Sequence, residues 1–370
     1  DNTAGGGGDG SPGSPYNTLA AGISAAGNND FIYVYEGDGT STGYTGNFVL
    51  RDTGQKLYGE GADFYIDGDT VTFPGFPPED VNGHVIIPAG GFPILTSNSG
   101  DTITIRNNSG IEVAGIRIDN AADEAIYVRD NNADNAIIRD VIINNPGDEG
   151  IFSNSGDNLI IANVQINNAG QDAIYLNNSA DTLIYNTTIT SPGRYGVRYR
   201  NSDNNVGQLV TVNNSGNHAF SVENGTSSLE LDQVTVNTTT AGDGIYLSSD
   251  NEDNYEITNS NITGTFRHGI HINGADNGTI TGINITNSGD DGIHFSNASA
   301  NTGNTISNIL VTNAGGDGLY AYYIDNTSVN TFEVNGSGGY GLHYDYTVSY
   351  THLRAHETLM NLVCRLLLEK

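Results

Sequence analysis

Among the acidic and histidine side chains that stand directly before a glycine in this 370-residue chain, three follow one another at similar steps. The side chains are Asp243, His268 and Asp291, at steps of 25 and 23 residues. Glycoside hydrolysis uses two carboxyl groups, one as an acid and one as a base or nucleophile. If the segments around them stack as parallel strands about 4.8 Å apart, the two carboxylates lie about 10 Å apart, at the upper edge of what inverting hydrolysis allows. The alternative is that Asp before Gly only forms a turn.

A basic cluster offers a second kind of chemistry. It contains Tyr195, Arg198 and Arg200, and His218 follows one repeat later. A polysaccharide lyase needs a cation that neutralises a uronate carboxylate, and a side chain such as Tyr, His or Arg that moves the α-proton. These side chains could supply both. The alternative is an ordinary cross-strand ion pair with the nearby Glu223.

Aromatic and histidine side chains recur at a regular spacing and form a third group, which we call the aromatic stripe. Tyr rings can stack on sugar rings, so the group predicts a glycan-binding surface. The alternative is that the rings stack on one another and stiffen the molecule by about 0.5–1 kcal/mol per pair. His271 and His294 also suggest a metal, but the further ligands of a tetrahedral site cannot be placed. The candidate ligand-binding residues are Tyr127, Phe152, Tyr175, Tyr246, His271, His294 and Tyr320.

All these candidates belong to a signature that occurs ten times: a small residue, an apolar residue, and then usually an aromatic residue or histidine. The steps between the apolar central residues are 23 to 26 residues, which indicates a solenoid. Another apolar residue stands eight or nine positions earlier, often followed two positions later by Asn, as at Asn120 and Asn145. Strand, Asn bend, strand and turn in each repeat predict a parallel β-helix. The central residues are Ile126, Ile151, Ile174, Val197, Phe220, Ile245, Ile270, Ile293, Leu319 and Leu342.

Strand alternation predicts which side chains face the core. If the central residues point inward, the residues two positions later do so too, with the polar Ser153 as an exception, and the stripe between them points outward. The stripe is completed by Arg198, Ser221 and His343. We call the residues before the small residue the second column; alternation does not define their direction, because a following Gly can break it. They are Glu124, Glu149, Asp172, Tyr195, His218, Asp243, His268, Asp291, Asp317 and Tyr340.

The repeat resembles the right-handed parallel β-helix repeat proteins, which have the pectate-lyase-like architecture of pectin-degrading enzymes and of many bacterial surface proteins. The resemblance covers about residues 98 to 345. The opening residues resemble the start of β-helical passenger segments in bacterial surface proteins of the autotransporter type. In the β-helical pectin hydrolases, Asp residues and a Gly-His-Gly carry the reaction. Here the order of these elements differs, and no Arg-x-Lys follows them.

Composition excludes several classes of partner. The chain has 43 acidic and 13 basic residues and a net charge of −30, so nucleic acid and anionic lipid are poor partners. A polyuronate could still bind through bridging Ca²⁺, although no cofactor is required. No apolar run is long enough to span a membrane. The only Cys is Cys364, near the end, which suits export through an oxidising compartment.

The sequence predicts four regions. Residues 1–15 form a Gly/Ser/Pro linker, and residues 16–97 form an N-terminal cap and irregular first coils, with a short helix at residues 17–26 and a loop at residues 72–93. Residues 98–347 form the regular coils. Residues 348–370 break the register and resemble translated vector sequence, or else form a capping helix. We expect the natural protein to be longer than this chain.

Together these patterns predict a secreted or cell-surface, all-β, right-handed parallel β-helix with a short N-terminal capping helix. We expect a non-enzymatic, adhesin-like module or stalk whose partner is a polysaccharide or a cell-surface glycan. The location is then extracellular, or the outer surface of a bacterium. The alternative is a carbohydrate-active enzyme, either a polysaccharide lyase or a glycoside hydrolase, that acts on the strand face.

Overall fold

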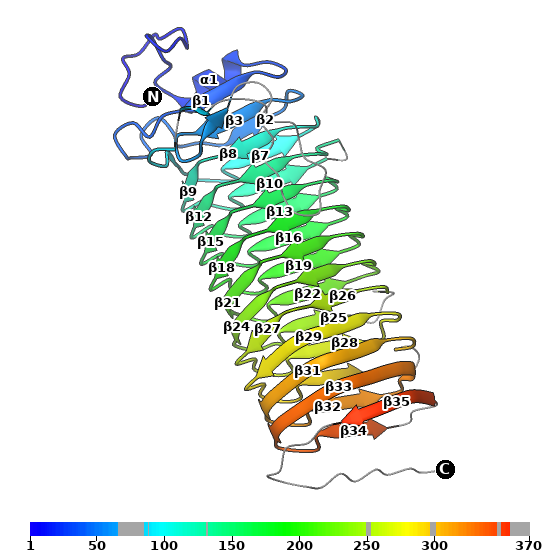
Figure 1. Ribbon diagram of the computed structural model, residues 1–370. Coiled ribbons are helices and arrows are strands. Elements are labelled where there is room, and N and C mark those ends of the chain that lie inside the picture. Colours follow the sequence, from blue (N-terminus) through cyan, green and yellow to red (C-terminus); the bar gives the residue numbers. More distant parts are fainter. Residues whose placement is uncertain are drawn as a thin grey trace. The chain divides into compact units, whose positions relative to one another are not determined.

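The computed structural model describes residues 1–65, 85–87, 89–130, 132–248, 253–296, 301–345 and 349–355. The chain contains two compact units. Unit 1 comprises residues 1–173 and 178–188, and unit 2 comprises residues 174–177 and 189–370. Each unit is a right-handed parallel β-helix in which the strands of successive coils pair in parallel (Figure 1). The predicted all-β fold class is confirmed.

Unit 1 begins with the predicted helix, α1, which spans Leu19–Ala25. The helix starts there because the Thr18 hydroxyl accepts a hydrogen bond from the Ala21 amide, a regular N-cap. Leu19 is its buried residue, and the helix packs against the first strands, β1 (Phe31–Val34) and β2 (Phe48–Leu50). The expected loop at residues 72–93 lies largely outside the described residues. Within it, β5 (Val85–Ile87) forms an antiparallel pair with β4 (Phe64–Tyr65), which precedes the loop.

The coils of unit 1 use two parallel sheets. One sheet carries the aromatic stripe and is called the stripe sheet; the other is called the second sheet. The stripe sheet of unit 1 contains β2 (Phe48–Leu50), β7 (Ile103–Arg106), β10 (Ile126–Arg129) and β13 (Ile151–Asn154). The second sheet contains β1 (Phe31–Val34), β3 (Lys56–Gly59), β6 (Ile94–Leu95), β8 (Glu112–Ala114), β9 (Arg117–Asp119), β11 (Ile137–Arg139), β12 (Ile142–Asn144), β14 (Ile160–Ala162), β15 (Gln165–Asn167), β17 (Leu183–Tyr185) and the start of β18 (Thr188–Thr190).

Unit 2 repeats the same arrangement. Its stripe sheet contains β16 (Ile174–Asn177), β19 (Val197–Arg200), β22 (Phe220–Glu223), β25 (Ile245–Leu247), β28 (Ile270–Asn273), β30 (Ile293–Ser296), β32 (Leu319–Tyr322) and β34 (Leu342–Asp345). Its second sheet contains β20 (Val206–Gln208), β21 (Thr211–Ser215), β23 (Glu230–Asp232), β24 (Thr235–Thr239), β26 (Glu256–Thr258), β27 (Asn261–Thr263), β29 (Thr279–Thr286), β31 (Thr305–Ala314), β33 (Asp325–Ser337) and β35 (Ser349–Ala355).

The core of each unit is the predicted column of apolar side chains. In unit 2, Ile245, Ile270 and Ile293 are register partners and are fully buried. Leu342, in the last coil of the series, is only half-buried. In unit 1, the exception Ser153 is buried and pairs its hydroxyl with that of Ser179 at 2.8 Å. A buried hydroxyl costs little when it has such a partner.

At the glycine positions, the small residue before the central residue is required by space, as Gly292 shows. A Cβ added to Gly292 would lie 2.5 Å from the carbonyl oxygen of Gly318 and 2.7 Å from the Val311 Cγ1 atom. Those distances are shorter than van der Waals contact. The next coil therefore packs directly on the glycine backbone, and larger residues are excluded there.

The predicted asparagine bends are confirmed. Asn120, Asn145 and Asn168 in unit 1 adopt positive φ values of 53°, 51° and 55°. The side-chain amide of Asn168 donates to Asn145 at 3.0 Å, and that of Asn145 donates to Asn120 at 3.4 Å. Asn tolerates this left-handed conformation better than most residues and, when stacked, also bonds to its neighbour in the next coil.

The capping helix, which was the alternative for the C-terminal region, is wrong where the chain is described. Residues Ser349–Ala355 form β35, which pairs in parallel with β33 through several register shifts. The rest of the leucine-rich string lies outside the described residues, so its vector-like origin stays a prediction. Among the described residues, no helix has the length and apolarity needed to cross a membrane.

Candidate functional site

The aromatic stripe lies where strand alternation predicts. In unit 1, Tyr127 and Phe152 stack with ring centroids 4.9 Å apart. In unit 2 a longer series of ring contacts joins the stripe to the second column. Three of these contacts are stacked and three are tilted or edge-to-face, so the ring faces are only partly covered, and a ligand on this surface also meets ring edges, hydroxyls and ring nitrogens. The contacts are Tyr195–His218, His218–Tyr246, Tyr246–His271, His271–His294, His294–Tyr320 and Tyr320–His343.

The basic cluster is engaged within the protein. Arg198 forms an ion pair with Glu223 at 2.7 Å, and its guanidinium lies 4.7 Å from the centre of the Tyr175 ring. Register places Arg200 opposite Glu223 on the next strand. The ion-pair interpretation is therefore confirmed for Arg198. The lyase interpretation stays a prediction, but the positive charge of Arg198 is already bound to a carboxylate.

The structure defines the direction of the second column, which the sequence left open. In unit 2 these side chains lie beside the stripe and contact it. Asp291 accepts a hydrogen bond from His294 Nδ1 at 2.6 Å, and Asp317 accepts one from His343 Nδ1 at 2.7 Å. The two neighbouring columns therefore form one polar ladder along the stripe sheet of unit 2.

A structural requirement explains why hydrogen-bond acceptors occupy the second column. Each side chain accepts the backbone N–H of the equivalent residue one coil later, and so satisfies a buried donor next to the Gly. Either imidazole or carboxylate can do this, so His and Asp can both occupy the column. The donor and acceptor pairs are Asp243 N to His218 Nδ1 at 2.9 Å, His268 N to Asp243 Oδ1 at 3.0 Å, Asp291 N to His268 Nδ1 at 3.2 Å, and Asp317 N to Asp291 Oδ1 at 2.6 Å.

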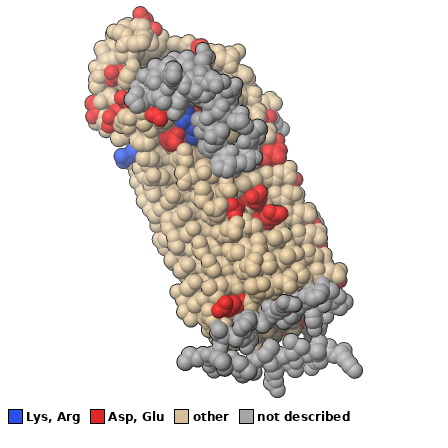
Figure 2. Space-filling view, in the orientation of Figure 1, with Lys and Arg blue, Asp and Glu red and all other residues tan. Residues whose placement is uncertain are grey.

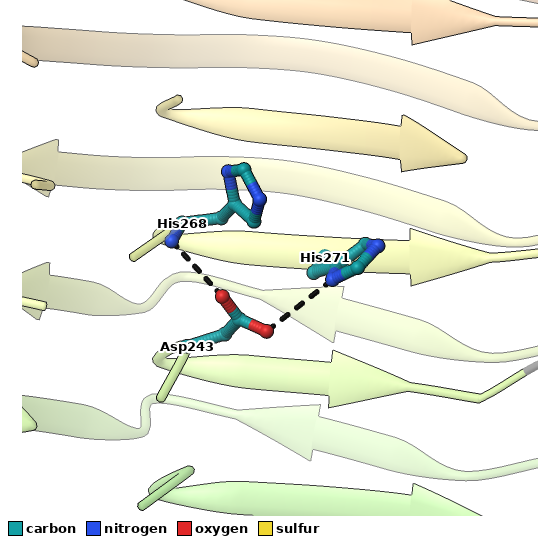
Figure 3. Close-up of side chains that lie close together, drawn as sticks. All are labelled: Asp243, His268 and His271. Carbon is teal, nitrogen blue, oxygen red and sulfur yellow. Dashed lines mark hydrogen bonds and ion pairs between the residues drawn. The ribbon is translucent and has the colours of Figure 1, made fainter. Parts of the chain in front are cut away.

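Asp243 is the most enclosed member of this ladder, and its side chain is fully buried. Figure 3 shows that its two oxygens point to different partners: one to the His268 backbone amide and the other to His271. The distance from Asp243 Oδ2 to His271 Nδ1 is 3.3 Å. Burial would raise the pKa of Asp243, but the hydrogen bond from His271 and the nearby histidines hold it below its usual value. Asp243 is therefore a buried, ionised carboxylate.

Two histidines of the second column are neutral. Burial lowers the pKa of His218 to about 4, although Asp243 acts in the opposite direction. Burial and the neighbouring His294 also lower the pKa of His268. This agrees with their hydrogen bonds, because a ring nitrogen that accepts a backbone N–H carries no proton. Their proximity to Asp243 and Asp291 is therefore not a salt bridge at neutral pH.

Several groups of side chains have a geometry that could accept a metal ion. In unit 2, His268 could share an ion with either Asp243 and His271 or Asp291 and His294, because the ligand atoms within each group lie within 4.8 Å of one another. Most of these atoms already bond to protein partners. In unit 1, carboxylates of Asp101, Asp123, Glu124, Asp148 and Glu149 gather in the same way and offer the oxygen ligands that Ca²⁺ prefers. The expectation that Ca²⁺ binds stays a prediction.

Charge is unevenly distributed over the surface. On the face drawn in Figure 2, acidic side chains lie in a few separate patches and basic side chains are rarer. A cavity of about 450 Å³ lies elsewhere in unit 1, between α1 and β1, and is lined by Leu19, Ile32 and Tyr44 among others. No residue that the sequence singled out for chemistry lines it.

The structure adds one residue that the sequence analysis missed. Ser296, at the end of β30, places its hydroxyl 2.8 Å from His271 Nε2. The sequence feature that could have revealed Ser296 is its position two residues after His294, because alternation places it on the same outward face as the stripe. Only the diagonal approach of two neighbouring coils brings the hydroxyl to His271.

The short strands, asparagine bends and inward apolar columns define a right-handed parallel β-helix protein. The chain belongs to the family described as right-handed β-helix region, whose model matches residues 101–255 and 243–358. No curated protein sequence matches the chain.

Solved structures of similar fold share little sequence with this chain. The A-module of the mannuronan C-5 epimerase AlgE4 from Azotobacter vinelandii is 14% identical with a TM-score of 0.57, over 93% of this chain and 95% of that one. The Thermotoga maritima exopolygalacturonase is 12% identical with a TM-score of 0.52, over 70% and 83%. The Dettilon tailspike protein is 14% identical with a TM-score of 0.58, over 81% and 61%. At these identities the similarity establishes the fold alone.

Proposed function

We propose that this chain is an extracellular, adhesin-like module that binds polysaccharide along the stripe sheet of unit 2 without cleaving it. The observation that carries the proposal is the polar ladder. From Tyr175 to His343, the stripe sheet presents side chains in register, most of them aromatic or histidine, one coil after another. A glycan chain laid along the ladder would meet equivalent groups at each step.

Binding would use the edges of the rings. Tyr320 donates its hydroxyl to Asp345 at 3.1 Å, and the Tyr246 hydroxyl accepts a long hydrogen bond of 3.4 Å from Asn273. Such hydroxyl, amide and carboxylate groups match the hydrogen-bonding capacity of sugar hydroxyls. Because contacts with neighbouring rings occupy part of the ring faces, we assign most of the affinity to these polar edges.

Similarity of fold supports a carbohydrate partner. The structures of similar fold include an epimerase named for mannuronan, an exopolygalacturonase, and a tailspike. These names also favour an extracellular location or the outer surface of a bacterium. A polyuronate could bind in addition through Ca²⁺ held by the acidic cluster of unit 1, since the chain itself is strongly acidic.

Burial argues against glycosidic cleavage by the sequence candidates. Asp243 is fully buried and Asp291 is only 7% exposed, so neither carboxylate can reach a sugar-sugar bond without rearrangement. The alternative, a lyase or glycoside hydrolase on the strand face, would need an exposed acid and base. We therefore expect no new reducing ends and no unsaturated products from pectin, polygalacturonate or alginate. Either product would favour the enzyme.

The binding test separates ring edges from ring faces. Replacing Tyr246 and Tyr320 by Phe removes the hydroxyls and keeps the rings, whereas replacing them by Ala removes both. We compare how much retention on immobilised polysaccharide each variant loses relative to the original chain. We expect the loss in the Phe variant to be at least half of the loss in the Ala variant. A control variant carrying Asn261→Ala and Asn284→Ala changes outward residues of the second sheet and should be retained like the original chain.

Thermal melts accompany each variant so that loss of fold is not mistaken for loss of binding. Unchanged retention of a folded Ala variant would reject the proposal. Retention of the Phe variant with loss of the Ala variant would keep glycan binding but assign it to the ring faces.

A further inference from the structure

Ser296, His271 and Asp243 come from three successive coils and form a continuous chain of hydrogen bonds. Ser296 Oγ lies 2.8 Å from His271 Nε2, and His271 Nδ1 lies 3.3 Å from Asp243 Oδ2. A hydroxyl, an imidazole and a carboxylate joined in this order are the parts of a nucleophilic acyl-transfer site. Recognition of such a site depends on geometry and roles, because the arrangement occurs on unrelated folds.

The β-helix brings these residues together by its register. His271 pairs with His294 on the next strand, and Ser296 lies two residues further along, so imidazole and hydroxyl meet diagonally. A diagonal pair on one face of a sheet is about 7–8 Å apart at Cα, a distance that an imidazole can span. Asp243 approaches from the preceding coil, where its other oxygen is held by the His268 backbone amide.

The hydrogen bonds also select the tautomer that a general base needs. The Asp243 carboxylate accepts the hydrogen bond at Oδ2, so His271 donates from Nδ1. In the neutral ring, Nε2 is then the acceptor and receives the Ser296 proton. His343 offers a comparison within the same sheet: its Nδ1 is bound to Asp317, but its Nε2 lies 3.6 Å from the Asp345 carboxylate. At that place the imidazole faces a carboxylate, where His271 faces the hydroxyl of Ser296.

An oxyanion donor is available beside the hydroxyl. Asn273 is the register partner of Ser296, so its carboxamide lies on the same outward face one coil away. One of its two N–H groups is directed to the Tyr246 hydroxyl. The other can face a developing negative charge next to Ser296, as side-chain amides do in several oxyanion holes.

We propose that Ser296, His271 and Asp243 hydrolyse carboxylic esters with small acyl groups, an activity that goes beyond the proposed glycan binding and does not depend on it. Ser296 Oγ bonds to the acyl carbon while its proton passes to His271 Nε2. The tetrahedral intermediate expels the alcohol oxygen, which takes that proton and leaves an acyl-Ser296. Water then attacks the acyl carbon as His271 accepts its proton, and collapse returns a proton to Ser296 Oγ and releases the carboxylic acid.

We expect the acyl group to be small because Ser296 is half-buried between neighbouring coils. The rings of Tyr246 and His294 lie on the same face and limit the room for the acyl group. The alcohol part of the ester can be large, since it would extend over the open strand face. Nothing in this step requires a metal ion.

The test uses the full chain with a fluorophosphonate probe and with p-nitrophenyl acetate. We expect the probe to label Ser296, as located by peptide mass spectrometry, and Ser296→Ala to lose both labelling and hydrolysis. His271→Gln should lower the hydrolysis rate at least about 100-fold. A matched control should keep the original rate: Ser307→Ala removes a half-buried hydroxyl of the second sheet, outside the ladder.

Ser296→Ala deletes one oxygen from a half-buried position, so a thermal melt should show that it folds like the original chain. A chain that is not labelled, or a Ser296→Ala variant that still hydrolyses the ester, would overturn the proposal. A rate that disappears with EDTA and returns with Zn²⁺ would also overturn it and assign the chemistry to a metal held by the histidines.

Discussion

The second column occupies the same position of the repeat in both units, but the pKa values of its carboxyl groups are shifted in opposite directions. In unit 1, Glu124 lies among other carboxylates, and burial, a hydrogen bond to Asp101 and the charge of Glu149 raise its pKa to about 8. In unit 2, Asp243 and Asp291 alternate with histidines. Burial acts to raise their pKa values as well, but hydrogen bonds from His271 and His294 hold both below the usual value.

This difference shows that the coil geometry does not decide ionisation. Both columns are partly buried and follow the same backbone path. A neighbour of like charge one coil away favours the protonated acid, whereas a neighbouring imidazole favours the carboxylate. Where histidines stand between the carboxylates, as in unit 2, the column forms hydrogen bonds that fix the imidazole tautomers. Where carboxylates stand next to one another, as in unit 1, it stays an acidic stack.

The largest expected effect comes from replacing a carboxyl group by an amide in each unit. Asp243→Asn places an N–H donor against either the His268 amide or the His271 Nδ1–H, and should lower the free energy of unfolding by about 2–4 kcal/mol. Glu124→Gln should change it by less than about 0.5 kcal/mol at neutral pH, because that carboxyl is already largely protonated. Urea denaturation followed by circular dichroism measures both. Equal losses would contradict the comparison.

A pH change should affect the two units in opposite senses. The pKa of His218 is about 4 in the folded chain and about 6.5 in the unfolded one, so its contribution to stability is present above pH 6.5 and is lost as the pH falls toward 4. For Glu124, the folded pKa of about 8 exceeds the usual 4.5, so its contribution is present below pH 4.5 and is lost as the pH rises toward 8.

Hydrogen exchange read peptide by peptide, and corrected for the intrinsic pH dependence, resolves the two effects. Between pH 8 and pH 5, protection should increase around residue 124 and decrease around residue 218. A His218→Gln variant should lose most of the pH dependence around residue 218. A parallel change in both regions would mean that a shared transition hides the local ionisation.

The smallest expected effect is at the asparagine bends, which should not differ between the units. Asn145 and Asn287 have φ values of 51° and 56°, and each bonds to an asparagine of a neighbouring coil. Replacing either by Ala should cost about 1–2 kcal/mol, because Ala disfavours the left-handed region. Replacing either by Gly should cost less. Clearly unequal losses at the two positions would show that the units also differ outside the second column.

Much of the fold could be predicted from the sequence, because the same pattern of residues occurs ten times. The inward position of Ile270 and the outward position of His271 follow from strand alternation alone, and the bend at Asn145 follows from residue type and spacing. The ion pair of Arg198 with Glu223 also followed, since both stand at outward positions of neighbouring coils. The candidate site was harder to read, because alternation stops at the glycine and leaves the direction of Asp243 open.

The amino-acid order determined the coil period, the apolar columns, the asparagine bends and the place of each outward side chain, because these depend on spacing within one or two coils. Only the tertiary structure decided that Asp243 is buried, that the second column accepts the backbone amides of the next coil, and that Ser296 meets His271 diagonally. Those outcomes depend on side-chain direction and burial between stacked coils. Residue types and intervals along a single chain do not specify either of them.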